Sequence, residues 1–311
     1  MAKILITESV HPIGPELLTA AGHTVVYADR DMDIIRREIV DADAVLVRII
    51  ELPGSLLATA KNLKIVSKHG VGYDNIDLDY CKSHGVAVTI TPNANSLSVA
   101  EHAFTLMLTL AKNIIPVSNK YRMVGFAAKN HAPGLEMTGK TLGLIGMGRI
   151  GKHVLHMCKD GLDMHVIVYD PYISEVPEGV EKVDDLSELL RRADVVTLHC
   201  LLTDETRKLI DRERLALMKP TALLINCARG PIVDEAALIE ALENGRLAGA
   251  GLDVTDPEPV APDSPLFKLP NVIVTPHYAP TTVESATRVS KIAAENINAV
   301  LAGQEPVGRI V

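Results

Sequence analysis

The chain has 311 residues, of which 47% are hydrophobic and 23% are charged, and its formal net charge is −8 at pH 7. This length allows two domains of ordinary size, each with its own core. The negative charge argues against a nucleic-acid partner, which needs a basic face, and no apolar stretch is long and uncharged enough to span a bilayer.

The first hundred residues alternate short β-branched blocks with helical patterns. Strands are predicted at residues 3–7, 23–28, 44–48, 64–70 and 86–91, with helical patterns at 14–22 and 31–41. Alternation of this kind predicts a parallel sheet that is covered by helices on both faces.

A single long helix is predicted from Ser98 to Arg122, with Ser96 or Ser98 as its N-cap. The alternation then restarts. Strands are predicted at 141–146, 165–170, 195–200, 222–228, 250–254 and 272–276, and a final helix at 281–303.

Two doubly wound, Rossmann-like units in series follow from this order, so the predicted fold class is α/β with two parallel sheets. If the final helix packs back on the first unit, the second unit is an insertion. The predicted substrate-binding (catalytic) domain consists of residues 1–98 plus 283–311, and the predicted dinucleotide-binding domain consists of residues 99–282. Because open α/β sheets bind ligands beyond the carboxyl ends of their strands, a cleft between the units is the expected active site.

A Gly-x-Gly-x-x-Gly motif follows the strand at 141–146 and opens a helix, the context that a dinucleotide-binding turn requires. Gly146 would permit the tight turn, Gly148 would let the backbone approach a pyrophosphate, and Gly151 would let helix and strand pack closely. The backbone N–H groups of Arg149 and Ile150 would face the phosphates.

Asp170 ends the next strand, about twenty residues further on, where a carboxylate can bind both ribose hydroxyls. The following residues, Pro171 and Tyr172, supply no cation for a 2′-phosphate, so NAD is predicted rather than NADP. The alternative is that the glycines only tighten a turn and that Asp170 is a solvated strand end.

Three further strand ends offer the groups that hydride transfer from an alcohol needs: a base, a cation for the anionic end of the substrate, and a group that tunes the base. These are His277, Arg229 and Glu258. Each alone could be an ordinary surface residue, but all three lie at the carboxyl ends of strands in one predicted sheet.

The stretches "GKTLGLIGMGRIG", "LINCARGPIVDEAALIEAL", "AGAGLDVTDPEP" and "TPH" together resemble the D-isomer-specific 2-hydroxyacid dehydrogenase family. That family includes D-3-phosphoglycerate dehydrogenases and hydroxypyruvate or glyoxylate reductases, and the resemblance covers nearly the whole chain. It implies an NAD-dependent enzyme that interconverts a small D-2-hydroxyacid and its 2-ketoacid. The expected form is the short one, without a regulatory domain.

By this resemblance His277 would exchange the hydroxyl proton, and Glu258 would hydrogen-bond its other ring nitrogen, fix the tautomer and favour the protonated ring. Arg229 would bind the substrate carboxylate and the neighbouring oxygen. Asp253 would hold the nicotinamide carboxamide, unless it is structural at its strand end. Further cofactor contacts are implied near the nicotinamide ring for Cys227 and Ala228, and on the adenosine side for His199, Cys200 and Thr206.

In the first unit, "SKHGVGYDNID" resembles the substrate loop of the family, where the N–H groups of Val71 and Gly72 would bind the carboxylate. A plain glycine-rich turn explains the same glycines. Arg48 could face a second anionic group of the substrate, or could be a solvated strand end. Nearby pocket residues depart from the family pattern, since Tyr278 and Ala279 follow the histidine where a Gly-Gly pair is common.

The cysteines are far apart, show no Cys-x-x-Cys spacing, and are expected to be small buried hydrophobes in a reducing compartment rather than disulfides or metal ligands. The start of the chain lacks the features of a signal peptide, so a cytoplasmic location is expected. A homodimer is expected because "AEHAFTLMLTLAKNII" offers more apolar surface than one partner needs. The alternative function is that of an NAD(H)-sensing, corepressor-like protein of the same fold.

Overall fold

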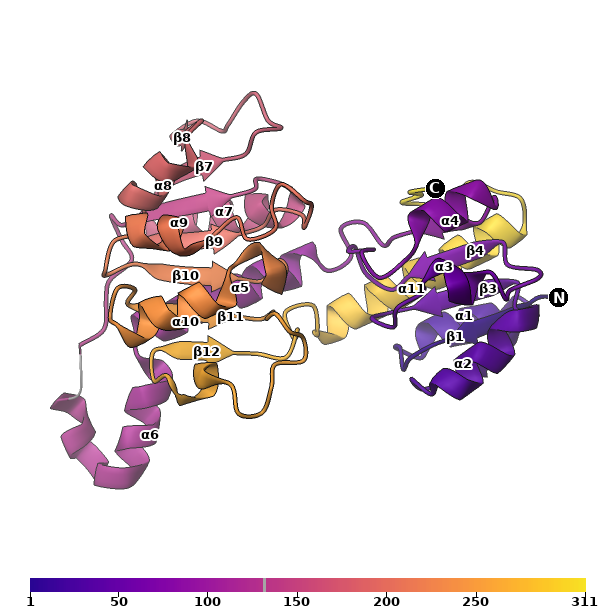
Figure 1. The fold of residues 1–311 in the computed structure, drawn as a ribbon, viewed down its shortest axis with the longest axis horizontal. Coiled ribbons are helices and arrows are strands. Elements are labelled where there is room, and N and C mark those ends of the chain that lie inside the picture. Colours follow the sequence, from indigo (N-terminus) through magenta and orange to yellow (C-terminus); the bar gives the residue numbers. More distant parts are fainter. Residues whose placement is uncertain (131–132) are drawn as a thin grey trace. The chain divides into compact units, whose positions relative to one another are not determined.

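The computed structural model describes residues 1–130 and 133–311, which form two compact units (Figure 1). Unit 1 contains Met1–Asn95 and Thr281–Val311, and unit 2 contains Ser96–Pro280. Unit 2 is therefore an insertion within the sequence of unit 1. The boundaries lie a few residues before the predicted positions 98/99 and 282/283.

Unit 1 is built on a five-stranded sheet in which every pairing is parallel, in the order β2-β1-β3-β4-β5. The strands are β1 (Lys3–Ile6), β2 (Thr24–Tyr27), β3 (Ala44–Val47), β4 (Ile65–Lys68) and β5 (Ala87–Thr89). The helices are α1 (Ile13–Ala20), α2 (Met32–Glu38), α3 (Gly54–Leu57), α4 (Leu78–Ser83) and α11 (Val283–Leu301), with a short 3-10 turn at Ile39–Asp41.

Both faces of the unit 1 sheet are buried, which explains why its strands are continuous apolar runs. Ile4 and Ile6 pack with α1 and α11 on one face, while Leu5, between them, packs with α2, α3 and α4 on the other. A Cβ on Gly14 in α1 would lie 2.4 Å from Oγ of Ser290, so the glycine allows α1 and α11 to pack closely. The final helix thus completes the core of unit 1.

Unit 2 is built on a seven-stranded parallel sheet in the order β12-β11-β10-β9-β6-β7-β8. The strands are β6 (Thr141–Ile145), β7 (His165–Tyr169), β8 (Val180–Lys182), β9 (Val195–Leu198), β10 (Leu223–Asn226), β11 (Gly249–Leu252) and β12 (Val272–Val274). Helices α5 (Ser96–Ala111) and α7 (Arg149–Leu162) cover one face. Helices α8 (Leu186–Arg192), α9 (Arg212–Leu217) and α10 (Glu235–Glu243) cover the other.

The predicted α/β class with two doubly wound parallel sheets is confirmed. In unit 2 the strand order reverses between β6 and β9, and in unit 1 it reverses between β1 and β3. Such switch points are where doubly wound sheets open a crevice for a ligand. Strand β8 was not predicted, because it is a short edge strand without a long apolar run.

The prediction of one long helix from Ser98 to Arg122 is wrong, because the structure has two. Helix α5 begins at Ser96 and ends at Ala111, and α6 spans Ile114–Val124, followed by a 3-10 segment at Gly125–Asn130. Asn113 stands between them with a φ of 51°, in the left-handed region that Asn tolerates better than most residues. Its side-chain Nδ2 donates to the Pro133 carbonyl at 3.1 Å. A single left-handed residue ends the helix without disturbing the apolar pattern.

All four cysteines are free thiols, and burial raises the pKa of Cys81 to about 11 and that of Cys158 to about 12. Neither thiol is therefore a ready nucleophile at neutral pH. Within residues 1–130 and 133–311, no group of three or more His, Cys, Asp or Glu side chains is placed to hold a metal ion. No helix in those residues has the length and apolar character needed to cross a membrane.

Candidate active site

The glycine turn of unit 2 lies at the switch point of its sheet. Gly146 directly follows β6 and has a φ of 89°, a conformation that favours glycine. A Cβ there would lie 2.8 Å from the backbone nitrogen of Cys200 and from the carbonyl carbon of His199. The turn after β6 therefore packs directly against the end of β9.

The other two glycines of the motif differ in their surroundings. Gly148 is the N-cap of α7, and, apart from its chain neighbours and its own helix, no part of residues 1–130 and 133–311 lies within 4 Å of the position that its Cβ would take. A Cβ on Gly151 would lie 2.2 Å from the carbonyl oxygen of Gly146. Gly151 thus brings α7 close to the turn, while Gly148 leaves open space beside the first N–H groups of the helix, at Arg149 and Ile150. These residues fit the pyrophosphate of a dinucleotide.

Asp170 is fixed beside this turn. Its Oδ2 accepts a hydrogen bond from the backbone N–H of Met147 at 2.9 Å, and its Oδ1 accepts one from the backbone N–H of Tyr172 at 3.0 Å. The carboxylate therefore joins the end of β7 to the glycine turn. Binding of a ribose by Asp170 stays a prediction, and its bond from Met147 was not predicted from the sequence.

The residues predicted on the adenosine side lie at and after the end of β9. Nε2 of His199 is 2.8 Å from Oγ1 of Thr197, and burial lowers the pKa of His199 to about 3. Burial raises the pKa of Cys200 to about 11. The hydroxyl of Thr206 donates to the Leu201 carbonyl at 2.6 Å. Thr206 thereby closes its own loop, and the ring of His199 is neutral at physiological pH.

Arg229 lies in a loop after β10 that is held by the buried Asn226. Nδ2 of Asn226 donates to the carbonyl of Arg229 at 2.9 Å, and its Oδ1 accepts from the backbone nitrogen of Ala228 at 3.0 Å. A Cβ on Gly230 would lie 1.9 Å from the carbonyl oxygen of Thr255, so the loops after β10 and β11 are in direct contact. The guanidinium of Arg229 is half-buried, and its Nη1 donates to the Ala228 carbonyl at 2.8 Å.

Cys227 is buried next to this loop. Burial, followed by the charge of Asp253, raises the pKa of the Cys227 thiol well above its ordinary value. The thiol is therefore neutral, as a residue lining a nicotinamide ring would be.

Glu258 and His277 form a direct pair. Oε1 of Glu258 is 2.7 Å from Nδ1 of His277, and both side chains are partly exposed. His277 has a φ of 52°, and its backbone N–H donates to the carbonyl of Asp253 at 2.7 Å. Because the carboxylate occupies Nδ1, Nε2 is the ring nitrogen available for proton exchange.

Asp253 is almost fully buried, at 1% exposure, and both of its oxygens accept hydrogen bonds. Oδ1 accepts from the Thr275 hydroxyl at 2.6 Å and from the backbone N–H of Tyr278 at 2.7 Å, while Oδ2 accepts from the N–H of Ala279 at 2.8 Å. Nε2 of His102 is 3.4 Å from Oδ1. Asp253 therefore holds the loop that carries the histidine, which is the structural role that the sequence left open. Binding of the nicotinamide carboxamide stays a prediction.

We expect Asp253→Asn to lower the free energy of unfolding by about 2 kcal/mol at pH 7, because charge-assisted hydrogen bonds would be lost. Burial by itself raises the pKa of Asp253, but hydrogen bonds from His102, Thr275 and two backbone N–H groups outweigh it and hold the pKa below its ordinary value. The carboxylate therefore contributes stability above its unfolded pKa, and that contribution is lost as the pH falls through the folded pKa.

Urea unfolding of both proteins from pH 8 to pH 3.5 measures this effect. The difference between them should stay constant down to about pH 5 and narrow below about pH 4, near the ordinary pKa of an aspartate. A difference that widens on acidification would contradict the argument.

In unit 1 the switch point is filled by a carboxylate of the chain itself. The side chain of Glu8, which follows β1, is 1% exposed. Its Oε2 accepts from the backbone N–H of Arg48 at 2.7 Å, and both oxygens lie 3.0 Å from the N–H of Ile49. Arg48 as a whole residue is half-buried, and its Nη1 donates to the carbonyl of Ser9 at 3.3 Å. Glu8 was missed in the sequence, where only its place after a strand could have marked it.

The loop containing Val71 and Gly72 lies beside Arg48 at the same edge of the unit 1 sheet. Lys68, at the end of β4, is buried, and its Nζ donates to the carbonyl of Arg48 and to Oδ1 of Asn75. Nδ2 of Asn75 donates to the carbonyl of Ile50 at 2.7 Å. A buried ammonium thus joins the Arg48 loop to the loop predicted to bind a carboxylate.

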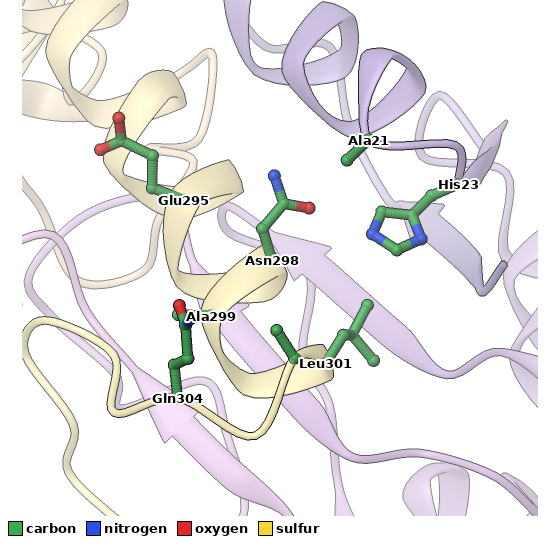
Figure 2. A pocket seen from close by; sticks show the side chains of 8 residues that line it. Ala21, His23, Glu295, Asn298, Ala299, Leu301 and Gln304 are labelled. Carbon is green, nitrogen blue, oxygen red and sulfur yellow. The ribbon is translucent and has the colours of Figure 1, made fainter.

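A separate hollow of about 460 Å³ lies in unit 1 near the ends of α1 and α11 (Figure 2). Its polar lining includes His23, Glu295, Asn298 and Gln304. His23 precedes β2, so the hollow belongs to the opposite edge of the sheet from Arg48. It contains none of the predicted site residues.

A glycine turn at a switch point, with a histidine–carboxylate pair on the same edge of a parallel sheet, defines a dinucleotide-dependent α/β protein. Residues 104–279 match the model of the D-isomer specific 2-hydroxyacid dehydrogenase, NAD binding domain. The chain belongs to this family, and its cofactor is a nicotinamide dinucleotide.

The relatives cover nearly all of the chain. It is 42% identical over 308 residues to the D-3-phosphoglycerate dehydrogenase of Methanocaldococcus jannaschii, a match that covers 98% of this chain and 58% of the relative. It is 37% identical to the glyoxylate reductase of Thermofilum pendens, a match that covers 98% of this chain and 93% of the relative. The crystal structure of the TT0316 protein from Thermus thermophilus matches this chain with a TM-score of 0.93 at 35% identity. The match covers 99% of this chain and 100% of the TT0316 chain. The chain spans little more than half the length of the D-3-phosphoglycerate dehydrogenases that it matches.

Proposed function

We propose that the chain is an NAD-dependent oxidoreductase that interconverts a small D-2-hydroxyacid and its 2-ketoacid. The observation that carries this proposal is the 2.7 Å pair of Glu258 and His277, on the same sheet edge as the glycine turn. The names of the relatives support it, since they are D-3-phosphoglycerate dehydrogenases and glyoxylate reductases.

His277 is the proposed acid–base group. Nε2 would accept the hydroxyl proton during oxidation and return it to the carbonyl oxygen during reduction. Glu258, bonded to Nδ1, orients the ring and stabilises the imidazolium that forms. A bound nicotinamide ring supplies the hydride acceptor for oxidation and the donor for reduction.

Arg229 is the proposed substrate cation. Its charge persists at every physiological pH, and its planar fork matches a carboxylate together with a neighbouring oxygen. As negative charge develops on the reacting oxygen, Arg229 and a protonated His277 would stabilise it. The N–H groups of Val71 and Gly72 are proposed as further carboxylate donors, and Arg48 as the partner of a second anionic group.

The proposed cofactor is NAD rather than NADP. The carboxylate of Asp170 lies beside the glycine turn, where the backbone N–H groups of Met147 and Tyr172 fix it. That carboxylate suits ribose hydroxyls and would repel a 2′-phosphate. Asp253 would contribute to the nicotinamide side through the loop that it anchors.

Turnover of NADH with a panel of 2-ketoacids, namely glyoxylate, hydroxypyruvate, pyruvate and 3-phosphohydroxypyruvate, tests the proposal. The expected result is oxidation of NADH with at least one acid and weaker use of NADPH. NADH binding without turnover of any acid would contradict it and would favour the corepressor-like alternative.

We further propose a cytoplasmic homodimer that associates through α6 and the 3-10 segment after it. Helix α6 has no buried residue. Apolar side chains are exposed along these elements, with Met123 at 80% and Phe126 at 77% exposure. The dimer was expected from the apolar stretch at residues 100–115, and the part of that stretch in α5 lies mostly in the core of unit 2. Since contiguous exposed apolar surface is rare on monomers, α6 is the better candidate.

Replacing Met123 and Phe126 together with lysine should convert the dimer to a monomer, because two desolvated apolar anchors would become charged. Sedimentation velocity at micromolar concentration measures the change. Val307→Lys is the control, since Val307 is 61% exposed and lies in unit 1. A wild-type chain that sediments as a monomer would contradict the assignment.

A further inference from the structure

Two loops at the carboxyl edge of the unit 2 sheet are joined by a hydrogen bond between side chains. The hydroxyl of Tyr172, in the loop after β7, donates to Oε2 of Glu205, in the loop after β9, at 3.1 Å. Strands β7 and β9 are the two neighbours of β6, which leads into the glycine turn. The bond therefore connects the loops on either side of the turn, where the adenosine end of a dinucleotide is proposed to bind.

Both partners of this bond are held by further hydrogen bonds. The backbone N–H of Tyr172 donates to Oδ1 of Asp170, the carboxylate proposed to bind the ribose. In the other loop, the backbone N–H of Thr203 donates to the hydroxyl of Thr206 at 2.7 Å, which closes the turn that carries Glu205. Defined hydrogen bonds therefore set the position of the Glu205 carboxylate relative to Asp170.

The joined side chains are open to a ligand. Tyr172 is 83% exposed, and Glu205 is exposed as well. The hydrogen bond to Glu205, followed by the charge of Glu205, raises the pKa of Tyr172, and the charge of Asp170 contributes in the same direction. The hydroxyl therefore stays protonated at neutral pH, within electrostatic range of both carboxylates. A bond between exposed groups adds little stability, so its main consequence is the placement of a negative charge.

The placement of this charge matters for the choice between two dinucleotides. NADP differs from NAD by a phosphate on the 2′-oxygen of the adenosine ribose, which a nearby arginine accommodates in proteins that bind NADP. If Asp170 binds the ribose hydroxyls, a phosphate on one of them would extend toward the residues that follow Asp170, namely Pro171 and Tyr172. There it would approach the Glu205 carboxylate, which has the same sign of charge.

We propose that Glu205, held by Tyr172, is a second determinant of the preference for NAD over NADP, because its carboxylate repels a 2′-phosphate. The inference rests on the proposed function, in which Asp170 carries this preference. Asp170 would act by binding the ribose, whereas Glu205 would act through its charge and would take no part in hydride transfer. One negative charge about 7 Å from a phosphate of nearly two charges weakens binding about three- to fivefold in water of low ionic strength.

Isothermal titration calorimetry of the full chain with NADH and with NADPH tests the inference at about 20 mM and about 1 M NaCl. At low salt the wild type should bind NADPH at least about tenfold more weakly than NADH. Glu205→Gln keeps an acceptor for Tyr172 but removes the charge, so the ratio of the NADPH Kd to the NADH Kd should fall about three- to fivefold. The Kd of NADH itself should change less than about twofold. At 1 M NaCl, where the screening length is about 3 Å, the effect on the ratio should shrink below about 1.5-fold.

Two further variants and a control separate charge from contact. Tyr172→Phe removes the hydroxyl that holds the carboxylate, so it should lower the ratio about twofold in the wild type and leave it unchanged in Glu205→Gln. Glu205→Lys reverses the charge and should lower the ratio about tenfold or more. Glu243→Gln is the control, because Glu243 is an exposed carboxylate at the end of α10, where the chain approaches the beginning of β11 at the opposite edge of the sheet.

The melting temperatures of the variants should stay within about 1 °C of wild type, since the altered side chains are exposed. A ratio that Glu205→Gln leaves unchanged, or lowers equally at both salt concentrations, overturns the inference, while NADH binding by the wild type leaves the proposed nucleotide site intact. A wild-type ratio near 1 overturns the inference and the NAD preference together, and the dehydrogenase assignment stands. A wild type that binds neither dinucleotide overturns the nucleotide site itself, and the inference with it.

Discussion

His277→Ala should lower kcat for 2-ketoacid reduction about a thousandfold, within the range that a positioned acid–base group contributes. The reason is geometric. Nδ1 is bonded to Glu258 at 2.7 Å, so Nε2 is the ring nitrogen from which a proton can reach the carbonyl oxygen. The dissociation constant of NADH should change by less than about threefold, because the histidine follows β12 and the glycine turn follows β6.

Steady-state kinetics and NADH fluorescence titration measure the two effects separately. Glu258→Gln keeps a hydrogen-bonding side chain but removes its charge, so we expect a loss of about tenfold to a hundredfold in kcat and a changed pH profile. The matched control is His156→Ala, an exposed histidine on α7 that pairs with Asp160. A kcat for His277→Ala within tenfold of wild type would remove the histidine from the proposed chemistry.

Gly151→Ala should destabilise unit 2 and abolish NADH binding. The new Cβ would lie 2.2 Å from the carbonyl oxygen of Gly146, a backbone atom that moves only if the turn or α7 moves. We expect the melting temperature to fall by roughly 5–10 °C, the effect of overpacking by about 2–3 kcal/mol. The turn that should hold the pyrophosphate would be displaced as well.

Two glycines of the same helix region provide matched controls. The new Cβ of Gly148→Ala has no neighbour within 4 Å in the described part of the chain beyond its own helix and adjacent residues, so the melting temperature should stay within about 1 °C of wild type. Its NADH affinity should nevertheless fall about tenfold or more, because the methyl group occupies the approach of the pyrophosphate. Gly161→Ala, exposed near the end of α7, should raise stability slightly and leave NADH affinity unchanged. Equal NADH affinity in Gly148→Ala and wild type would remove the dinucleotide from this turn.

The sequence predicted the fold well because both sheets are buried on both faces. Such strands are short apolar runs, and their alternation with helices leaves few topologies. Prediction failed where one residue decides the outcome. Asn113, in its left-handed conformation, divides a continuous apolar pattern into two helices, and β8 has no run of buried residues to reveal it.

The site was predictable in part for a similar reason. Arg229, Glu258 and His277 follow strands of one parallel sheet, and carboxyl ends of such strands meet at one edge. Their supporting groups were missed. His102 reaches Thr275 across 173 residues of sequence, and the role of Asn226 depends on a loop that closes onto its side chain. Such partners are chosen by tertiary packing, which the local pattern does not encode.

Because of Glu8, the switch points of the two sheets differ in whether they are already filled by a side chain. In both units the chain turns at the point where the strand order reverses, and backbone N–H groups there can bind a negatively charged group. In unit 1 that charge is covalently attached, since the Glu8 carboxylate already occupies the N–H groups of Arg48 and Ile49. The first sheet therefore fills this position with a side chain of its own. A doubly wound sheet that occurs twice in the chain can therefore bind the nucleotide at the switch point of its second copy, while Glu8 already fills the switch point of the first copy.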